Sequence, residues 1–366
     1  MQAEPARFLS PPGAPAGADA STESLAGWLA EHANRPENRG AIAHWQRIAA
    51  RPPRHGELTL PLPGPLAESL ESRGIARLYT HQVQAIEALR GGLDVVVVTG
   101  TASGKSLCYH LPVLERLLAD PEATALYLFP TKALTQDQLK GLTRLASGHP
   151  DLLRHLVAGV YDGDTLPSTR RKLRDSANVI LSNPDMLHQG ILPAHSKWSR
   201  FLSRLSFVVV DEMHAYRGIF GSHVANVMRR LRRLAAHYGA TPRFVLCSAT
   251  IRNPRELAAA LTGRDVTVVD DDGSPRGEKH FVFWNPPYHD GAKVERRSSN
   301  VEGCTLLTGL IAHGAQALAS VGGAPISTAA SSPPTSIPNS SALVHTTPCR
   351  APENRACSIL RRSSGR

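Results

Sequence analysis

The chain has 366 residues, a hydrophobic content of 42% and a formal net charge of +10. A chain of this length typically forms about two domains, and its apolar fraction is sufficient to bury a core. No apolar run approaches the roughly 20 residues that a transmembrane helix requires, and the N-terminus lacks the apolar centre of a signal peptide. A membrane protein is therefore not expected.

The cysteines and the charge distribution further limit the kinds of site and partner that are expected for this protein. Five cysteines without a C-x-x-C pair predict neither a zinc site nor a disulfide framework, and a reducing cytoplasm is the expected location. Residues 291–366 contain eight Lys or Arg against three Asp or Glu, which is half of the net charge. The net positive charge of residues 1–290 is therefore only weak support for nucleic-acid binding.

The N-terminal quarter contains two different patterns. Residues 1–20 are rich in Pro, Ala and Gly and predict a disordered leader. Residues 21–74 predict a helical extension followed by a proline-rich connector. The helical pattern runs from residue 21 to about residue 50, opens with a Ser/Thr cap, and places three apolar side chains on one face: Leu25, Trp28 and Leu29.

Residues 75–272 alternate short apolar runs with longer amphipathic stretches. The predicted strands are Val95–Val98, Ala125–Phe129, Leu156–Val160, Val179–Leu181, Phe207–Val210, Phe244–Cys247 and Val266–Val269. The predicted helices between them include Lys105–Leu118, Leu134–Ala146, His223–Tyr238 and Pro254–Leu261. Strands that are apolar on both faces and alternate with helices predict an α/β fold with a parallel sheet covered by helices on both sides.

Polar clusters follow five of the predicted strands. In an open parallel sheet, ligands bind at the carboxyl ends of the strands, so these clusters should share one edge. In chain order they read TGTASGKS, PTKAL, SNPD, DEMH and SAT.

The first cluster nearly matches the phosphate-binding loop G-x-x-x-x-G-K-[ST], with Thr99 in place of the first glycine. Small residues allow backbone N–H groups to surround a phosphate at the start of the next helix. Lys105 would then supply positive charge to the β- and γ-phosphates, and Ser106 a hydroxyl ligand for Mg²⁺. An ordinary strand–turn–helix is the alternative. The candidate nucleotide-binding residues are Thr99, Gly100, Thr101, Ala102, Ser103, Gly104, Lys105 and Ser106.

The fourth cluster places two acids at the end of an apolar strand. Asp211 would hold Mg²⁺, directly or through water, and Glu212 would act as the general base on the attacking water. A surface turn with two acids is the alternative for this cluster alone. Two such signals on separate strands of one sheet favour a Mg²⁺-dependent nucleotide hydrolase.

Taken together with Gln82 in LYTHQVQAI, these clusters resemble the superfamily 2 DEAD/DEAH-box helicases in order and rough spacing. The resemblance covers about Ile75 to Gly263. It implies a RecA-like P-loop domain over 75–272, with ATP and Mg²⁺ as cofactors. In this superfamily the first glycine of the loop is commonly replaced, as by Thr99, whereas Ala102 departs from the more usual glycine.

Several local sequences are closer to one branch, the MrfA/YprA-like bacterial DNA-repair helicases. They are TGTASGKS, YDGDT, SNPDMLH and DEMHAYRGIFGSHVANVMRRLRR. In the last of these, a basic face carries four arginines beside an apolar stripe. For that face we favour a solvated surface over a phosphate-binding one.

The resemblance also implies roles for eight residues outside the phosphate loop and the two acids. Adenine would be bound by Gln82, whose alternative is an exposed helix glutamine. The nucleic-acid backbone would be contacted by Thr131, Lys132, Asn183 and Asp185, whose alternatives are a helix N-terminus and an Asx-type turn. Nucleotide state would be coupled to lobe movement by His214, Ser248 and Thr250, whose alternatives are a structural histidine and ordinary strand-end hydroxyls.

The C-terminal part departs from the pattern of the superfamily. Residues 273–320 are expected to form a linker and the start of a second RecA-like lobe, but no arginine motif of such a lobe is found. The cysteine-rich C-terminal module of the branch is not found either. Residues 321–366 are rich in Ser and Pro and predict a disordered tail. A natural truncation and a change of reading frame near Ser320 both remain open.

The main hypothesis is an ATP-dependent, DNA-directed helicase, represented by its N-terminal ATP-binding lobe. Its expected partner is single-stranded or tailed duplex DNA, with no zinc and no membrane involved. The alternative is a non-catalytic nucleic-acid-binding or regulatory fragment that binds ATP poorly. Affinity for Mg-ATP and stimulated turnover distinguish the two. A metabolic P-loop ATPase is disfavoured, because PTKAL, SNPD and SAT would then have no purpose.

Overall fold

The computed structural model describes residues 25–289, 295–313, 315–318, 320–321, 324–325 and 345–347. By their contacts they form two units, the sheet unit (52–275) and the ribbon unit (up to 51 and from 276 onward). The leader expected over 1–20 and most of the tail expected over 321–366 lie outside the described residues. Within the described ranges, no helix is long and apolar enough to cross a bilayer.

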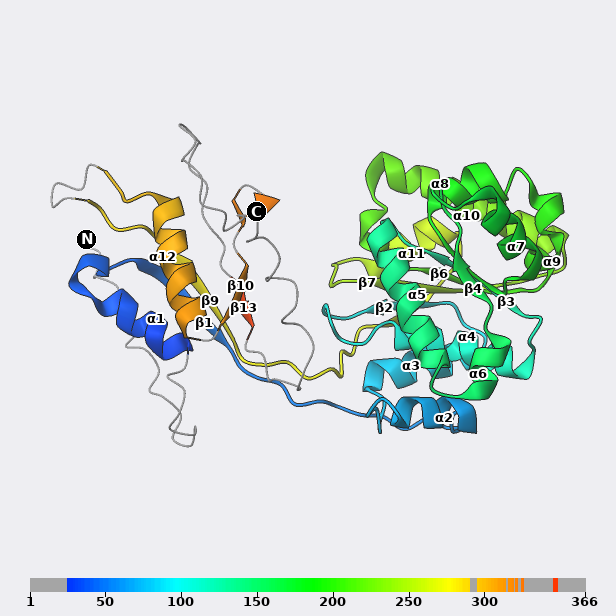
Figure 1. Ribbon diagram of the computed structural model, residues 1–366, viewed down its shortest axis with the longest axis horizontal. Coiled ribbons are helices and arrows are strands. Elements are labelled where there is room, and N and C mark those ends of the chain that lie inside the picture. The colour runs from blue at the N-terminus through cyan, green and yellow to red at the C-terminus, as the bar shows by residue number, and fades with distance from the viewer. Residues whose placement is uncertain are drawn as a thin grey trace, which may run out of the picture. The chain divides into compact units, whose positions relative to one another are not determined.

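A seven-stranded sheet forms the centre of the sheet unit (Figure 1). All neighbouring strands are parallel, in the order β4-β5-β3-β6-β7-β2-β8. The strands are β2 (Val95–Val98), β3 (Thr124–Leu128), β4 (Ala158–Val160), β5 (Val179–Ser182), β6 (Leu205–Val210), β7 (Arg243–Ser248) and β8 (Thr267–Val269). The seven predicted strands and their parallel arrangement are confirmed.

Helices connect these strands and confirm the predicted alternation. They are α2 (Gly64–Glu71), α3 (Thr80–Arg90), α4 (Leu107–Ala119), α5 (Lys132–Ala146), α6 (Pro150–His155), α7 (Pro167–Ser176), α8 (Pro184–Met186), α9 (Ser199–Ser203), α10 (Gly218–His237) and α11 (Pro254–Thr262). Short turns of other helix types cover Leu187–Ile191, His195–Trp198 and Met213–Ala215. The basic helix α10 begins earlier than expected, at Gly218.

The sheet separates two apolar cores. In β2, Val95 and Val97 pack into the core that contains Ile86 of α3. Val96 and Val98 pack into the other core, which is covered by α10 and α11. Successive side chains of a strand point to opposite faces, so an entirely apolar strand requires helices on both sides. Figure 1 shows α3 and α4 on one side of the sheet and α10 on the other.

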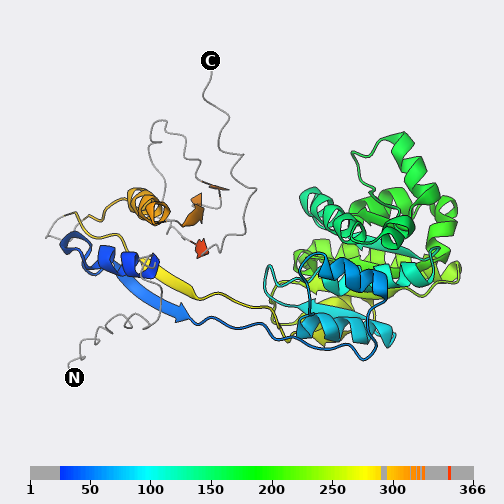
Figure 2. The ribbon, with the colours of Figure 1, turned by 60° about the horizontal axis from the view of Figure 1, so that its bottom comes forward.

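In the ribbon unit, the residues before and after the sheet unit come together. Strands β1 (Ile42–Ile48) and β9 (Lys279–Trp284) pair antiparallel and lie side by side in Figure 2. The prediction of a helix up to residue 50 is therefore wrong over β1, and the helix α1 ends at Asn34. A strand whose partner is distant in sequence cannot be recognised from local periodicity, because its hydrogen bonds come from the partner.

The segment 273–320, expected as a linker and the start of a second lobe, also contains α12 (Ser299–Ala312) and β10 (Gln316–Leu318). Residues of α12 pack with Trp28 of α1 in a small apolar core. Short strands β11 (Ser320–Val321), β12 (Ala324–Pro325) and β13 (His345–Thr347), and a turn over Pro36–Asn38, complete the unit. The expected extension over 21–74 is thus divided between the two units at residue 51.

Candidate nucleotide and nucleic-acid site

The sheet brings the five polar clusters to one edge, because all of its strands are parallel. The strand order divides this edge in two. The neighbouring strands β6, β7 and β2 carry the phosphate-loop half, which consists of 99–106, 211–214 and 248–250. The neighbouring strands β4, β5 and β3 carry the outer half, which consists of 131–132, 161–165 and 183–185.

The loop after β2 is closed by its own polar groups. The hydroxyl oxygens of Thr99 and Ser103 lie 2.6 Å apart and both residues are buried. Lys105 Nζ donates to the carbonyl oxygens of Thr99 (3.0 Å) and Gly100 (2.7 Å). Thr99, which replaces the expected glycine, therefore helps to hold both the loop and the ammonium group of Lys105.

Gln82 joins helix α3 to this loop. Its Nε2 donates to the carbonyl oxygen of Gly104 at 3.0 Å, and its Oε1 accepts from the backbone N–H of Tyr79 at 2.9 Å. A Cβ added at Gly104, where φ is +79°, would lie 2.7 Å from Gln82 Nε2. The glutamine is 2% exposed, so the alternative of an exposed helix residue is wrong. Its contact with adenine stays a prediction.

The buried carboxylate of Asp211 is held in place by two donors. Tyr109 of α4 donates its hydroxyl proton to Oδ2 at 3.0 Å, and the backbone N–H of Glu212 donates to Oδ1 at 2.8 Å. Burial raises the pKa of the Asp211 carboxyl, while these hydrogen bonds and the positive charge of Lys105 act in the opposite direction. The acid therefore lies within the electrostatic influence of the phosphate-loop lysine.

A short chain of polar contacts leads from Glu212 to β7. Glu212 Oε2 lies 3.2 Å from His214 Nδ1, and the same nitrogen lies 3.3 Å from Ser248 Oγ. The structure thus brings together the DEMH and SAT clusters, as coupling between them requires. Thr250 lies two residues further on and is exposed.

In the outer half, two of the candidate residues cap helices. Thr131 Oγ1 accepts from Leu134 N at 3.4 Å at the start of α5, and Asn183 Oδ1 accepts from Met186 N at 2.8 Å at the start of α8. The helix N-terminus alternative is therefore realised at Thr131, while Asn183 also caps a helix in place of the expected Asx-type turn. The nucleic-acid roles of these residues stay predictions. Asp185 is exposed, and Lys132 forms an exposed ion pair with Asp164.

The DEAD/DEAH box helicase family model matches residues 79–257. These residues form a DEAD/DEAH-box helicase domain. The chain is similar to the uncharacterized ATP-dependent helicase YprA of Bacillus subtilis (strain 168), with 46% identity over 265 residues, 71% of this chain and 34% of YprA. It is also similar to the ATP-dependent helicase HRQ1 of Saccharomyces cerevisiae (strain ATCC 204508 / S288c), with 41% identity over 281 residues, 76% of this chain and 26% of HRQ1.

A crystal structure of the helicase MrfA bound to DNA and AMPPNP matches with a TM-score of 0.74 and 41% identity, over 80% of this chain and 40% of MrfA. These matches confirm the RecA-like fold and the MrfA/YprA-like branch. The chain spans between 26% and 34% of the length of these two curated relatives.

Several residues that hold the site were not foreseen. Besides Asp211, the Tyr109 hydroxyl contacts Gln138 Oε1 of α5 at 2.9 Å. A hydroxyl has one proton, so Tyr109 donates to one acceptor at a time, and the carboxylate is the stronger acceptor. Asp272, near the end of the sheet unit, accepts from Gly100 N at 3.4 Å. The only sequence signal for Tyr109 is its place one turn after Ser106; the acidic run before Gly273 is a weak signal for Asp272.

The donors near the phosphate loop fit Mg²⁺. In the described part of the chain, no group of three or more His, Cys, Asp or Glu residues could hold a metal ion. Asp211 and the Ser106 hydroxyl nevertheless provide hard oxygen donors, and Mg²⁺ commonly takes one or two protein ligands while phosphate oxygens and water supply the rest. The positive charge of Lys105, held on the carbonyl oxygens of the same loop, suits a site that also receives phosphates.

Proposed function

We propose that the chain is the ATP-binding lobe of an ATP-dependent DNA helicase. The observation that carries this proposal is the common sheet edge, on which a phosphate loop, a buried acid and its neighbouring base candidate stand beside an exposed outer half. The first half suits phosphoryl chemistry, because its groups are pre-positioned and partly desolvated. The outer half suits a nucleic-acid backbone, because its polar groups remain accessible.

In this proposal each residue of the phosphate-loop half has a task. The backbone of residues 99–104 and Lys105 bind the phosphates, and Gln82 orients the loop against α3. Mg²⁺, held by Asp211 and Ser106, would neutralise phosphate charge when it is bound. Glu212 accepts the proton of the attacking water. His214 connects Glu212 to Ser248 and so reports the state of the site to β7.

The outer half is proposed to contact the backbone of single-stranded or tailed duplex DNA through Thr131, Lys132, Asn183 and Asp185, with Lys132 supplying the positive charge for a phosphate. Support comes from the relatives, since MrfA has been crystallised with DNA and AMPPNP. Backbone contacts carry no sequence information, so base sequence should have little effect on affinity. A role in DNA repair in the cytoplasm belongs to the same proposal and rests on the resemblance to the MrfA/YprA-like branch.

Nucleotide and DNA binding by the 366-residue chain test this proposal directly. A fluorescent ATP analogue should bind in the presence of Mg²⁺ and more weakly after chelation with EDTA. A labelled oligonucleotide should bind with an affinity that falls as salt rises, because phosphate contacts release counterions. If DNA binds but the ATP analogue does not, the chain is instead a non-catalytic nucleic-acid-binding segment.

A further inference from the structure

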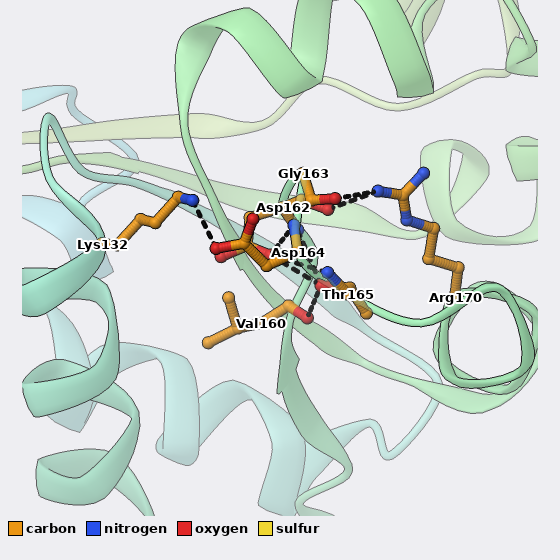
Figure 3. Close-up of polar contacts among 7 residues, drawn as sticks. All are labelled: Lys132, Val160, Asp162, Gly163, Asp164, Thr165 and Arg170. Carbon is orange, nitrogen blue, oxygen red and sulfur yellow. Dashed lines mark hydrogen bonds and ion pairs between the residues drawn. The ribbon is translucent and has the colours of Figure 1, made fainter.

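The loop after β4, which reads YDGDT, is fixed by hydrogen bonds within itself (Figure 3). Asp162 Oδ1 accepts from the backbone N–H of Asp164 at 3.0 Å and from that of Thr165 at 3.0 Å. The Thr165 hydroxyl has one proton, which it donates either to the same Asp162 oxygen (2.9 Å) or to the carbonyl oxygen of Val160 (3.1 Å). The two backbone donors and this hydroxyl hold the turn in a single shape, so the position of Asp164 is determined by the fold.

A second set of contacts anchors the loop to α7. Arg170 Nη2 donates to the carbonyl oxygens of Asp162 (2.8 Å) and Gly163 (2.9 Å). The guanidinium also lies over the ring of Tyr161, 5.7 Å from its centroid. Figure 3 shows Arg170 on one side of the turn and Lys132 on the other. The loop therefore holds Asp164 toward Lys132 at the start of α5.

At that tip, the Asp164 carboxylate forms an ion pair with Lys132 Nζ. The side chains are 59% (Lys132) and 75% (Asp164) exposed. Lys132 is a lysine to which the proposed function assigns a DNA phosphate. The carboxylate of Asp164, on a fixed loop, thus already pairs with the Lys132 ammonium group that a phosphate would bind. Exposed ion pairs of this kind contribute little to stability, so a phosphate can displace the carboxylate without disturbing the fold.

We propose that Asp164 competes with the phosphodiester backbone of DNA for Lys132 and so weakens the grip of the outer half. The inference rests on the proposed function, since it assumes that Lys132 contacts DNA. Asp164 neutralises Lys132 in the free protein, so a phosphate reaches the ammonium group only by displacing the carboxylate. A motor that moves along a strand must release each phosphate, and a competing carboxylate beside the lysine eases that release.

The test is binding of a fluorescein-labelled single-stranded oligonucleotide to the full chain, followed by anisotropy at low and at high salt. Asp164→Asn should tighten binding about two- to fivefold at low salt, as expected for removing an exposed charge interaction. The gain should shrink at high salt, because screening weakens the same interaction. Asp164→Ala serves as a second variant, and circular dichroism verifies that both remain folded.

Two further variants separate competition for Lys132 from a general change of charge. Asp265→Asn removes an equally exposed acid, paired with Arg255 and placed just before β8 at the opposite edge of the sheet, and it should leave affinity unchanged. Lys132→Gln should weaken binding, and Asp164→Asn added to it should then give little gain.

Each result decides between the inference and the function on which it rests. An Asp164→Asn affinity equal to that of the wild type, or an equal gain with Lys132→Gln present, overturns the inference alone if the wild type binds DNA. A wild type that binds no DNA while Asp164→Asn does supports the inference. If none of the proteins binds DNA at low salt, the DNA part of the proposed function and the inference both fail.

Discussion

The two halves of the sheet edge differ in burial and in backbone strain. In the phosphate-loop half, Thr99, Asp211 and Ser248 are all buried. The two residues other than glycine with positive φ in the described part of the chain, Ala102 (+59°) and Glu212 (+49°), also lie there. In the outer half Tyr161 and Asp162 are also buried, but its charged pair, Lys132 and Asp164, is exposed.

This difference fits the roles proposed for the two halves. A reaction at a phosphate is accelerated by groups that are fixed before the charge develops, and holding them can require strained backbone. A surface that binds and releases a phosphodiester backbone needs accessible charges whose partners exchange easily. Substitutions in the two halves should therefore differ in both the kind and the size of their effects.

The largest effect is expected at Glu212. Glu212→Gln should retain affinity for ATP, because the amide preserves the shape of the side chain, but ATP turnover should fall ~10²–10⁴-fold. Phosphate release in the presence of single-stranded DNA measures it, in this chain and in one joined to the second lobe of a related helicase. Glu122→Gln, an exposed change at the opposite edge of the sheet, is the control. A Glu212→Gln protein with most of its turnover would show that another group is the base.

Replacing one lysine of each half by alanine compares the two halves directly. Lys105→Ala should lower affinity for an ATP analogue about 10–100-fold, since it removes charged hydrogen bonds to phosphate. Lys132→Ala should leave that affinity unchanged, weaken DNA binding and reduce the salt slope of DNA binding by about 0.7. Titrations of both ligands with both variants give the result. Equal nucleotide affinities for the two variants would contradict the assignment of the phosphate loop.

A third prediction concerns a histidine buried in α4, the helix that begins at the phosphate loop. Burial lowers the pKa of His110 from its ordinary value of 6.5 to about 3. Between these two values the unfolded chain binds a proton that the folded chain does not. Stability should therefore fall as pH falls, by up to ~1.4 kcal/mol per pH unit from this residue.

His110→Gln should make this acid-induced loss less steep, even if stability at neutral pH also changes. Urea unfolding at about pH 7, 6 and 5 measures the slope of the unfolding free energy against pH. The exposed His188 provides a matched variant, His188→Gln, which controls for the loss of a histidine as such. An unchanged slope for His110→Gln would mean that His110 is not held neutral by burial.

The smallest effect is expected at Ala102. Because its φ is +59°, Ala102→Gly should relieve strain and raise the free energy of unfolding by about 1 kcal/mol. Ala259→Gly, within helix α11, should instead lower it by ~0.5–1 kcal/mol. Thermal unfolding of the two variants beside the wild type tests whether the strain is real. A destabilised Ala102→Gly protein would argue against it.

The sequence by itself was sufficient to predict the strands of the sheet unit and their parallel arrangement. Seven apolar runs predicted seven strands, because a strand buried on both faces is apolar throughout, and each run is short enough for local pattern to identify it. The clusters at the strand ends could be placed on one edge before any coordinates, since parallel strands carry their carboxyl ends to the same side. The motifs themselves gave Lys105, Asp211 and Glu212 their expected roles, and the resemblance added those of residues such as Gln82 and Lys132.

Only the tertiary structure decided which partners these residues have. The strand β1 was mistaken for helix, because its hydrogen bonds come from β9 at the other end of the described chain. Gln82 on the loop carbonyl, Tyr109 on Asp211 and Asp164 on Lys132 join residues at least 22 positions apart. Contacts of this kind depend on how elements pack in space and leave no periodic signal along the chain, so residue type and spacing do not reveal them.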